Sequence, residues 1–266
     1  MSNHQLTPGE SVDLRDLPTD GKQFHDNRKE AEKEFKKLRE EFVDLQACLY
    51  AEDKHKLLIV LQAMDAGGKD GTIRKMLEGT NPQGVRVESF KAPTKLELAH
   101  DYLWRVHRVV PARGMIGVFN RSHYEDVLVV RVENIVPKPV WRKRYDQINE
   151  FEELLSETGT KILKFFLHIS LDEQKERFQD RIDEPSKNWK FSMDDLEKRK
   201  KWESYMEAYE DMLNQCTTKC APWHVIPANQ KWYRNLTIMR TIVNTLRELK
   251  MEYPTQEHDL SNVAIE

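Results

Sequence analysis

The stretch that decides the fold reads Leu57-Leu58-Ile59-Val60-Leu61-Gln62-Ala63-Met64-Asp65-Ala66-Gly67-Gly68-Lys69-Asp70-Gly71-Thr72. It begins with an aliphatic run, residues 57–61, which predicts a buried strand. A loop of small residues follows, then a lysine and a sequence able to start a helix. This order is typical of a phosphate-binding site, because the N–H groups and the dipole of a helix N-terminus favour an anion.

The loop departs from the standard phosphate-loop motif, which has a glycine, four residues, Gly-Lys and then Ser or Thr. This chain has Ala63 in the first position and Asp70 directly after Lys69. The loop can still bind phosphate, because its glycines let N–H groups converge on phosphate oxygens and its lysine adds positive charge. The alternative is an ordinary turn. The residues expected to bind phosphate are Ala66, Gly67, Gly68, Lys69, Asp70, Gly71 and Thr72.

Two carboxylates, Asp65 and Asp70, flank the glycines. Bound phosphate would repel a carboxylate unless Mg²⁺ lies between them or a nucleophile has to be oriented. We therefore expect Asp65 to bind the metal or to orient the nucleophile. For Asp70 the favoured interpretation is a first-turn helix residue that complements the helix dipole.

The composition sets broad limits. A chain of 266 residues can form one large α/β domain, or a core domain with a mobile insertion. Only 39% of the residues are hydrophobic, and no aliphatic run is long enough to span a membrane. The acidic N-terminus lacks the apolar core of a secretory signal, and the three cysteines give no disulfide framework, so a cytoplasmic location is expected. Cys216, Cys220 and His224 match no zinc pattern, and helix-end residues are the favoured interpretation.

Charge is unevenly distributed along the chain. Residues 1–53 hold 13 acidic and 8 basic side chains, a net of −5, whereas residues 86–144 hold 12 basic and 6 acidic ones, a net of +6. A polyanion would bind the middle segment, although incidental surface asymmetry gives the same pattern. Nucleic-acid binding is disfavoured, because the aromatic residues are not interleaved with the basic ones.

Strand and helix patterns alternate along the chain. Residues 1–27 lack periodicity and are expected to form an extended arm, and residues 254–266 a loose acidic tail. The expected strands are 57–61, 85–91, 115–119, 161–169 and 223–227; the expected helices are 28–50, 96–109, 122–132, 140–157, one from 170, 193–215 and 236–249. This alternation predicts an α/β fold, with a parallel sheet sandwiched by helices and ligands at the strand carboxyl ends. Residues 28–253 would form a single domain, whose apolar stripe on helix 28–50 faces its own core or a second subunit.

Several basic residues are candidates for binding phosphate. Arg121 directly follows the third strand, and Glu125 would share its helical face, where the two could equally form a weak surface ion pair. Arg177 and Arg181 lie four residues apart ahead of the polar segment with Lys187, which suggests a lid at about 177–200 that closes on phosphates. A solvated helix is the alternative.

Three motifs in this order resemble the polyphosphate kinase 2 family over roughly residues 30–250. They are Leu58-Ile59-Val60-Leu61-Gln62-Ala63-Met64-Asp65-Ala66-Gly67-Gly68-Lys69-Asp70-Gly71, Gly117-Val118-Phe119-Asn120-Arg121-Ser122-His123-Tyr124-Glu125-Asp126, and the helix with Arg177 and Arg181. The resemblance implies a P-loop kinase fold related to thymidylate kinase. It also implies Mg²⁺-dependent phosphoryl transfer between inorganic polyphosphate and a nucleotide, by a dimer or tetramer.

The resemblance also implies roles for single residues. Asp65 would be the catalytic carboxylate, Lys69 the phosphate lysine and Arg121 the arginine of the second motif, with lid arginines at 177 and 181. Many family members have aspartate where this chain has Asn120, which leaves a metal role at that position open. Asn120 with Glu125 resembles the subgroup that accepts both AMP and ADP, and guanine nucleotides stay open as alternatives.

The expected mechanism is direct in-line transfer, with positive charge stabilising the equatorial oxygens. Polyphosphate would lie along a basic groove that includes Lys91, Arg131 and Lys187. Two other functions remain open at this point. One is an ATP-dependent nucleoside monophosphate kinase, and the other is a non-catalytic sensor of nucleotides or polyanions.

Overall fold

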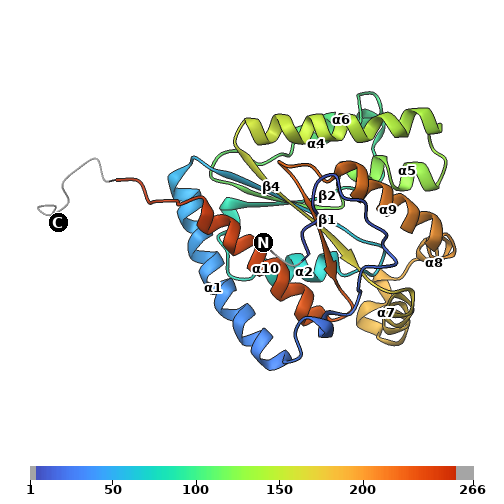
Figure 1. Ribbon diagram of the computed structural model, residues 1–266, viewed down its shortest axis with the longest axis horizontal. Helices are drawn as coiled ribbons and strands as arrows, with labels where there is room; N and C mark the ends of the chain where they lie inside the picture. The colour runs from blue at the N-terminus through green and yellow to red at the C-terminus, as the bar shows by residue number, and fades with distance from the viewer. Residues whose placement is uncertain (1–3, 256–266) are drawn as a thin grey trace, which may run out of the picture.

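The computed structural model describes residues 4–255, and Figure 1 shows them as a central sheet with helices on both faces. All strand pairs are parallel, in the spatial order β2-β3-β1-β4-β5. The strands are β1 (Lys56–Gln62), β2 (Val85–Ser89), β3 (Ile116–Asn120), β4 (Thr160–His168) and β5 (Trp223–Pro227). The opening strand of the sequence therefore occupies the centre of the sheet.

Strand β1 shows why both faces are covered. Leu57, Ile59 and Leu61 pack into one apolar cluster, with side chains of α1, α2 and α10. Leu58 and Val60 point the other way, into a second cluster formed with α6 and α9. A strand buried on both sides reads as a continuous apolar run, as this one does. The prediction of an α/β fold with a parallel sheet sandwiched by helices is confirmed.

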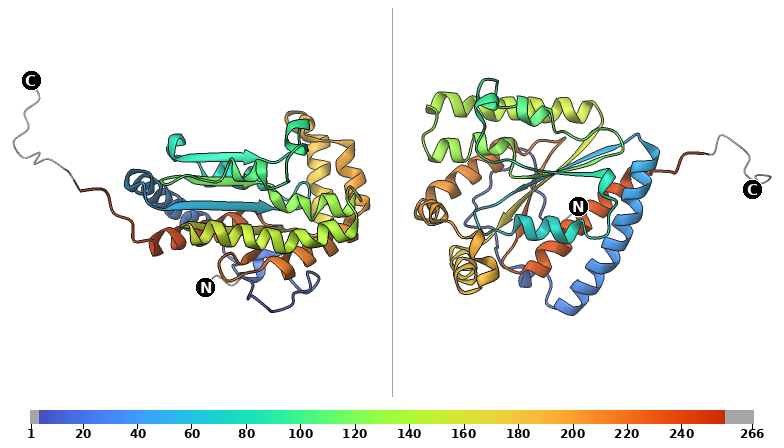
Figure 2. Two further views of the ribbon diagram at one scale, coloured as in Figure 1. Left: turned by 90° about the horizontal axis from the view of Figure 1, so that it is seen from above. Right: turned by 180° about the vertical axis from the view of Figure 1, so that it is seen from behind.

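The longer helices match the predicted pattern closely. They are α1 (Arg28–Glu52), α2 (Lys69–Met76), α6 (Lys138–Glu157), α7 (Leu171–Asp183), α8 (Met193–Lys200), α9 (Trp202–Cys216) and α10 (Lys231–Glu248). The apolar stripe of α1 packs on α10 and the sheet of the same chain, and the view from behind in Figure 2 shows α1 and α10 side by side.

Three predicted helices, 96–109, 122–132 and 193–215, are interrupted. Residues 96–109 form the short helices α3 (Lys95–Leu98) and α4 (Trp104–His107), because the Asp101 carboxylate accepts hydrogen bonds from the N–H groups of Leu103 and Trp104 and so starts a new turn. Residues 193–215 divide at Lys201 into α8 and α9. After Ser122 the chain forms a 3₁₀ turn, η3 (His123–Asp126), and then α5 (Val129–Val132).

The N-terminal segment lies along the edge of the sheet. His4 and Leu6 exchange backbone hydrogen bonds with Val225 and Trp223 of β5, and Leu14 is buried. The described part of this segment packs against the sheet, and it includes a 3₁₀ turn, η1 (Gly21–Gln23). No helix in residues 4–255 is both long and apolar enough to cross a membrane. Of the expected acidic tail, residues 256–266 lie outside the described part of the chain.

Candidate active site

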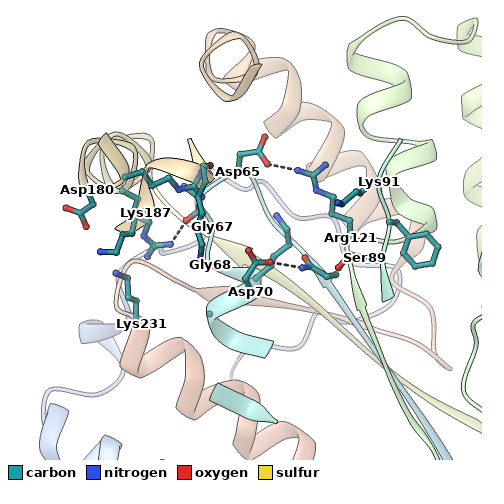
Figure 3. Close-up of a pocket in the computed structure, with 18 residues that line it drawn as sticks. Asp65, Gly67, Gly68, Asp70, Ser89, Lys91, Arg121, Asp180, Lys187 and Lys231 are labelled. Carbon is teal, nitrogen blue, oxygen red and sulfur yellow. Dashed lines mark hydrogen bonds and ion pairs between the residues drawn. The ribbon is translucent and has the colours of Figure 1, made fainter. Parts of the chain in front are cut away.

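The glycine-rich loop lies at the carboxyl end of β1, where it lines a cavity of about 470 Å³. Figure 3 shows the loop in the middle, with Arg121 and Lys91 on one side and Asp180, Lys187 and Lys231 on the other. Gly68 is the N-cap of α2, with a φ of +101° that favours glycine. The N-terminus of α2 therefore opens on a cavity surrounded by basic side chains.

Lys69 is folded back onto the loop that carries it. It is buried, and its Nζ donates to the carbonyl oxygens of Ala63 at 2.8 Å and Met64 at 3.4 Å. Burial and the nearby charge of Arg121 lower its pKa to about 8, against the opposing effect of Asp65 and other carboxylates. With a pKa of about 8, the amine at the cavity is still mainly protonated at neutral pH.

Asp65 and Arg121 form the centre of the site. The Arg121 Nη2 donates to Asp65 Oδ1 at 2.7 Å, and Lys198 from α8 approaches the other carboxylate oxygen at 3.3 Å. Burial alone would raise the pKa of Asp65, but the charges of Lys69, Arg121 and Lys198 outweigh it and keep the pKa below its usual value. Asp65 is therefore an ionised carboxylate surrounded by cations.

The backbone on both sides of this pair is strained. Ala66 and Arg121 have φ values of +61° and +60°, a region that costs a non-glycine residue about 1–2 kcal/mol. The Arg121 N–H donates to the Leu61 carbonyl, which fixes the turn after β3. Such strain is retained where surrounding contacts hold it, and it concentrates at functional sites.

A second cavity of about 470 Å³ adjoins the first and shares Asp65, Phe90, Lys91 and Arg121 with it. Glu125 is part of its wall, and the amide of Gln62 donates to that carboxylate at 3.0 Å. Much of the remaining lining is apolar or aromatic: Met64, Pro93, Leu98, Val129, Val130, Ile135, Val136, Tyr205 and Tyr209. One cavity is thus suited to phosphates, and the other to a ligand with a large apolar surface.

Asn120 lies in the phosphate cavity, where its side-chain amide donates to Asp70 Oδ1 at 2.7 Å (Figure 3). An aspartate at position 120 would place two carboxylates against each other at this contact. The Asn120 amide can donate a hydrogen bond to Asp70, which an ionised aspartate could not do. The contact therefore links the two departures from the expected motifs, Asp70 after the lysine and Asn120 in place of aspartate.

The two lid arginines differ in their contacts. Arg177 is buried, and its guanidinium donates to the carbonyl oxygens of Ala66, Ala228 and Asn229 at 2.9, 2.6 and 3.1 Å. Arg181 binds Asp195 at 3.0 Å and the Lys190 carbonyl, and so connects α7 to α8. Arg177 holds the loop in place, whereas Arg181 lines the cavity and joins two elements beside it.

Comparison with known proteins agrees with this geometry. A family model described as polyphosphate kinase 2 matches residues 25–254. The chain belongs to the polyphosphate kinase 2 family. It is 52% identical to an AMP/ADP-polyphosphate phosphotransferase of Meiothermus ruber, over all of both chains. It is 48% identical to an ADP-polyphosphate phosphotransferase of Rhodopseudomonas palustris, over 92% of this chain and 89% of that one. A crystal structure of polyphosphate kinase 2 from Arthrobacter aurescens superposes with a TM-score of 0.91 and 39% identity, over 96% of this chain and 91% of that chain.

Most residues singled out from the sequence of this polyphosphate kinase 2 lie around the two cavities. The phosphate cavity is lined by Asp65, Ala66, Gly67, Gly68, Lys69, Asp70, Gly71, Lys91, Asn120, Arg121, Arg177, Arg181 and Lys187. Thr72 is buried, and its hydroxyl donates to the Gly68 carbonyl. Arg131 borders neither cavity; its guanidinium binds Asp211 at 2.6 Å and lies over the Trp141 ring.

Sequence reasoning missed several side chains that this family member brings to the site. Lys198 reaches Asp65 from α8, and Lys231 lines the phosphate cavity from α10. Arg234 lies one turn further along α10, behind Gly68. Basic residues in the first turns of α10, where no acidic residue occurs in the first turn, oppose the helix dipole. That unfavourable placement is the signal that could have pointed to them.

Proposed function

We propose that this polyphosphate kinase 2 transfers a phosphoryl group between inorganic polyphosphate and AMP or ADP, giving ADP or ATP. The observation that carries the proposal is the meeting of two different cavities at Asp65 and Arg121. Polyphosphate occupies the basic cavity around the loop, and the nucleotide occupies the second cavity with its base against the apolar wall. The reacting phosphates then meet where the two cavities join.

The transfer is in line, with the attacking and leaving oxygens on opposite sides of the phosphorus. Lys69, Arg121 and the N–H groups at the start of α2 stabilise the charge that spreads over the equatorial oxygens. Arg181 and Lys187 bring further positive charge to the phosphate cavity. The chain needs no covalent intermediate, because positioning and electrostatic stabilisation account for most catalysis of this kind.

Mg²⁺ fits the residues of this site. Within residues 4–255 there is no cluster of three or more His, Cys, Asp or Glu side chains arranged to hold a metal ion. Mg²⁺ is usually held by one or two carboxylates together with water and substrate phosphates, and Asp65 supplies one ionised carboxylate. When bound, the ion would neutralise charge on the phosphate oxygens. Asp65 would hold it in exchange for part of its contact with Arg121 or Lys198.

The names of the relatives support the nucleotide part of the proposal. The Meiothermus ruber protein is named for AMP and ADP, and the Rhodopseudomonas palustris protein for ADP. Asn120 and Glu125 were the residues that suggested the AMP- and ADP-accepting subgroup. Glu125 lines the second cavity and Asn120 the first, so we assign both to nucleotide binding at the junction.

A cytoplasmic location and a homodimeric or homotetrameric assembly complete the proposal. Three free cysteines, Cys48, Cys216 and Cys220, support a reducing compartment. Family resemblance supports the assembly.

The test is an assay with AMP or ADP, long-chain polyphosphate and Mg²⁺. We expect ADP from AMP and ATP from ADP, and no product when EDTA replaces the metal. A protein that ignores polyphosphate but uses ATP as donor would be a nucleoside monophosphate kinase. Binding of both substrates without turnover in any combination would indicate a sensor, and either result would overturn the proposal.

A further inference from the structure

Arg234 is a buried cation that lies outside the three motifs quoted from the sequence. It lies in α10 with only 2% of its surface exposed. Its Nε and Nη2 donate to the side-chain oxygen of Asn235 at 3.1 and 2.9 Å. Its Nη1 is buried and has no hydrogen-bond partner among the described residues. A buried arginine normally uses its donors fully, so this orphaned group needs an explanation.

The unpartnered nitrogen lies against the phosphate loop. A Cβ built on Gly68 would stand 2.0 Å from Arg234 Nη1, and one on Gly71 would stand 3.9 Å from Nη2. The guanidinium thus touches the first turn of α2 from behind, while the N–H groups of that turn open on the cavity in front. Glycine at position 68 is required both by its positive φ and by the closeness of this cation.

Among residues 4–255 no carboxylate forms an ion pair with Arg234. The nearby Arg177 is also buried and also positive, and Glu173 is bound to Arg177 at 2.7 Å. Burial and Arg177 together lower the pKa of Arg234 to about 9, with Glu173 opposing. Two buried guanidinium groups with one carboxylate leave a net positive charge beneath the loop. An uncompensated buried charge of this kind is costly to a folded protein.

We propose that Arg234 is a positioning residue whose excess charge is balanced only when polyphosphate fills the loop. This inference rests on the proposed function and deepens it. Arg234 holds the backbone of Gly68 in place and adds attraction for the anion through the thin glycine wall. The unbalanced charge destabilises the free protein, and the bound polyanion removes this destabilisation by neutralising the charge. The part of the binding energy that comes from Arg234 is therefore specific to polyphosphate, and the nucleotide cavity does not share it.

The test compares Arg234→Met with Arg240→Met in the full-length protein. Arg240 lies on the same helix, but its Nε and Nη2 donate to the two carboxylate oxygens of Glu34, at 2.6 and 2.5 Å. Melting temperatures are measured with and without long-chain polyphosphate, together with KM for polyphosphate and for ADP. A methionine keeps most of the buried volume and removes the charge.

For Arg234→Met we expect a melting temperature of the free protein equal to or above that of the wild type, because the unbalanced charge is gone. The rise in melting temperature on adding polyphosphate should shrink, and KM for polyphosphate should increase about tenfold while KM for ADP changes less than twofold. Arg234→Lys keeps the charge and should retain most of the polyphosphate-induced rise. Arg240→Met should leave both KM values unchanged.

Two results would overturn the inference. In one, Arg234→Met fails to fold or melts well below the wild type, while Arg234→Lys responds to polyphosphate no better than the methionine variant; Arg234 is then a packing residue. In the other, Arg234→Met binds polyphosphate as well as the wild type. Failure of the proposed function looks different, because the wild type itself would then show neither turnover nor a shift with polyphosphate.

Discussion

Two groups of buried cations in this molecule are balanced in opposite ways. Lys164 in β4 is fully buried, and its three donors reach Tyr124 Oη, Glu152 Oε2 and the Cys216 carbonyl at 2.7, 2.6 and 2.7 Å. The other oxygen of Glu152 accepts from Tyr124 and His123. Around the phosphate loop, by contrast, Lys69, Arg177 and Arg234 donate mainly to neutral oxygens of the chain.

The difference shows how to tell a structural charge from a functional one. The Lys164 cluster contains its own counterion, so nothing from outside is needed to stabilise it. Burial alone would raise the pKa of Glu152, but Lys164 and His123 outweigh it and lower that pKa, which keeps the carboxylate ionised. The loop cluster has more positive than negative charge, and an anionic substrate supplies the remainder. The cations are buried in both places, and the balance between positive and negative charge distinguishes the two clusters.

The largest effect is expected from Asp65→Asn, which removes the carboxylate that binds Arg121 at the centre of the candidate active site. The kcat should fall by roughly 10³-fold, because the proposed metal ligand and the partner of Arg121 are lost together. The melting temperature should stay close to that of the wild type, since the amide keeps the shape of the side chain. Steady-state kinetics and thermal melts measure both quantities. A variant with a near-normal rate would remove Asp65 from its role.

A change in the Lys164 cluster should have the opposite profile. Lys164→Met leaves Glu152 buried without its cation, and we expect the free energy of unfolding to fall by about 3–5 kcal/mol. The double variant Lys164→Met with Glu152→Leu should recover part of that loss. Urea unfolding of the two variants measures the difference, and kcat per folded molecule should change little. Equal stability of the single variant and the wild type would refute the structural role of this cluster.

The pH dependence of polyphosphate binding should follow Lys69. Its pKa of about 8 is below the ordinary lysine value of 10.5, so between these values the unfolded chain holds a proton that the native protein has lost. The contribution of Lys69 to the free energy of unfolding of the free protein therefore rises with pH through that range. Polyphosphate prefers the protonated amine, so its affinity should fall above pH 8, by at most tenfold per pH unit. Calorimetric titration from pH 7 to 10 tests this, and Lys69→Met should lack the transition.

The smallest effect is expected from Arg131→Met. Arg131 was a candidate for the polyphosphate groove, but its guanidinium binds Asp211 away from both cavities. We expect KM for polyphosphate to change less than twofold and the free energy of unfolding to fall by about 1 kcal/mol or less, as for a partly exposed ion pair. Steady-state kinetics compare KM for polyphosphate in this variant with that in Lys187→Met, which changes a residue lining the phosphate cavity. A larger rise in KM for Arg131→Met than for Lys187→Met would place polyphosphate on another path.

The local sequence was enough to predict much of the fold, but only part of the candidate site. The apolar run of β1 and the glycines after it predicted a buried strand and a phosphate loop, because both features depend on neighbouring residues. The break at Asp101 was missed, since a side chain that accepts from the backbone competes with an apolar pattern that reads as one helix. Arg234 was missed because its relation to Gly68 spans 166 positions along the chain and depends on how α10 packs. Arg131 shows the opposite error. It lies in the basic segment 86–144, but its side chain binds Asp211 and lines neither cavity.

The N-terminal segment along β5 has a consequence for how the protein behaves at high concentration. Strand β5 ends one side of the sheet, and an open strand edge can pair with another chain and start aggregation. The hydrogen bonds from His4 and Leu6 occupy part of that edge. The opposite edge, β2, carries the exposed Arg86 and the partly exposed Glu88, and charges of this kind discourage pairing. The chain thus protects both sides of its sheet, one by covering it and the other by charge.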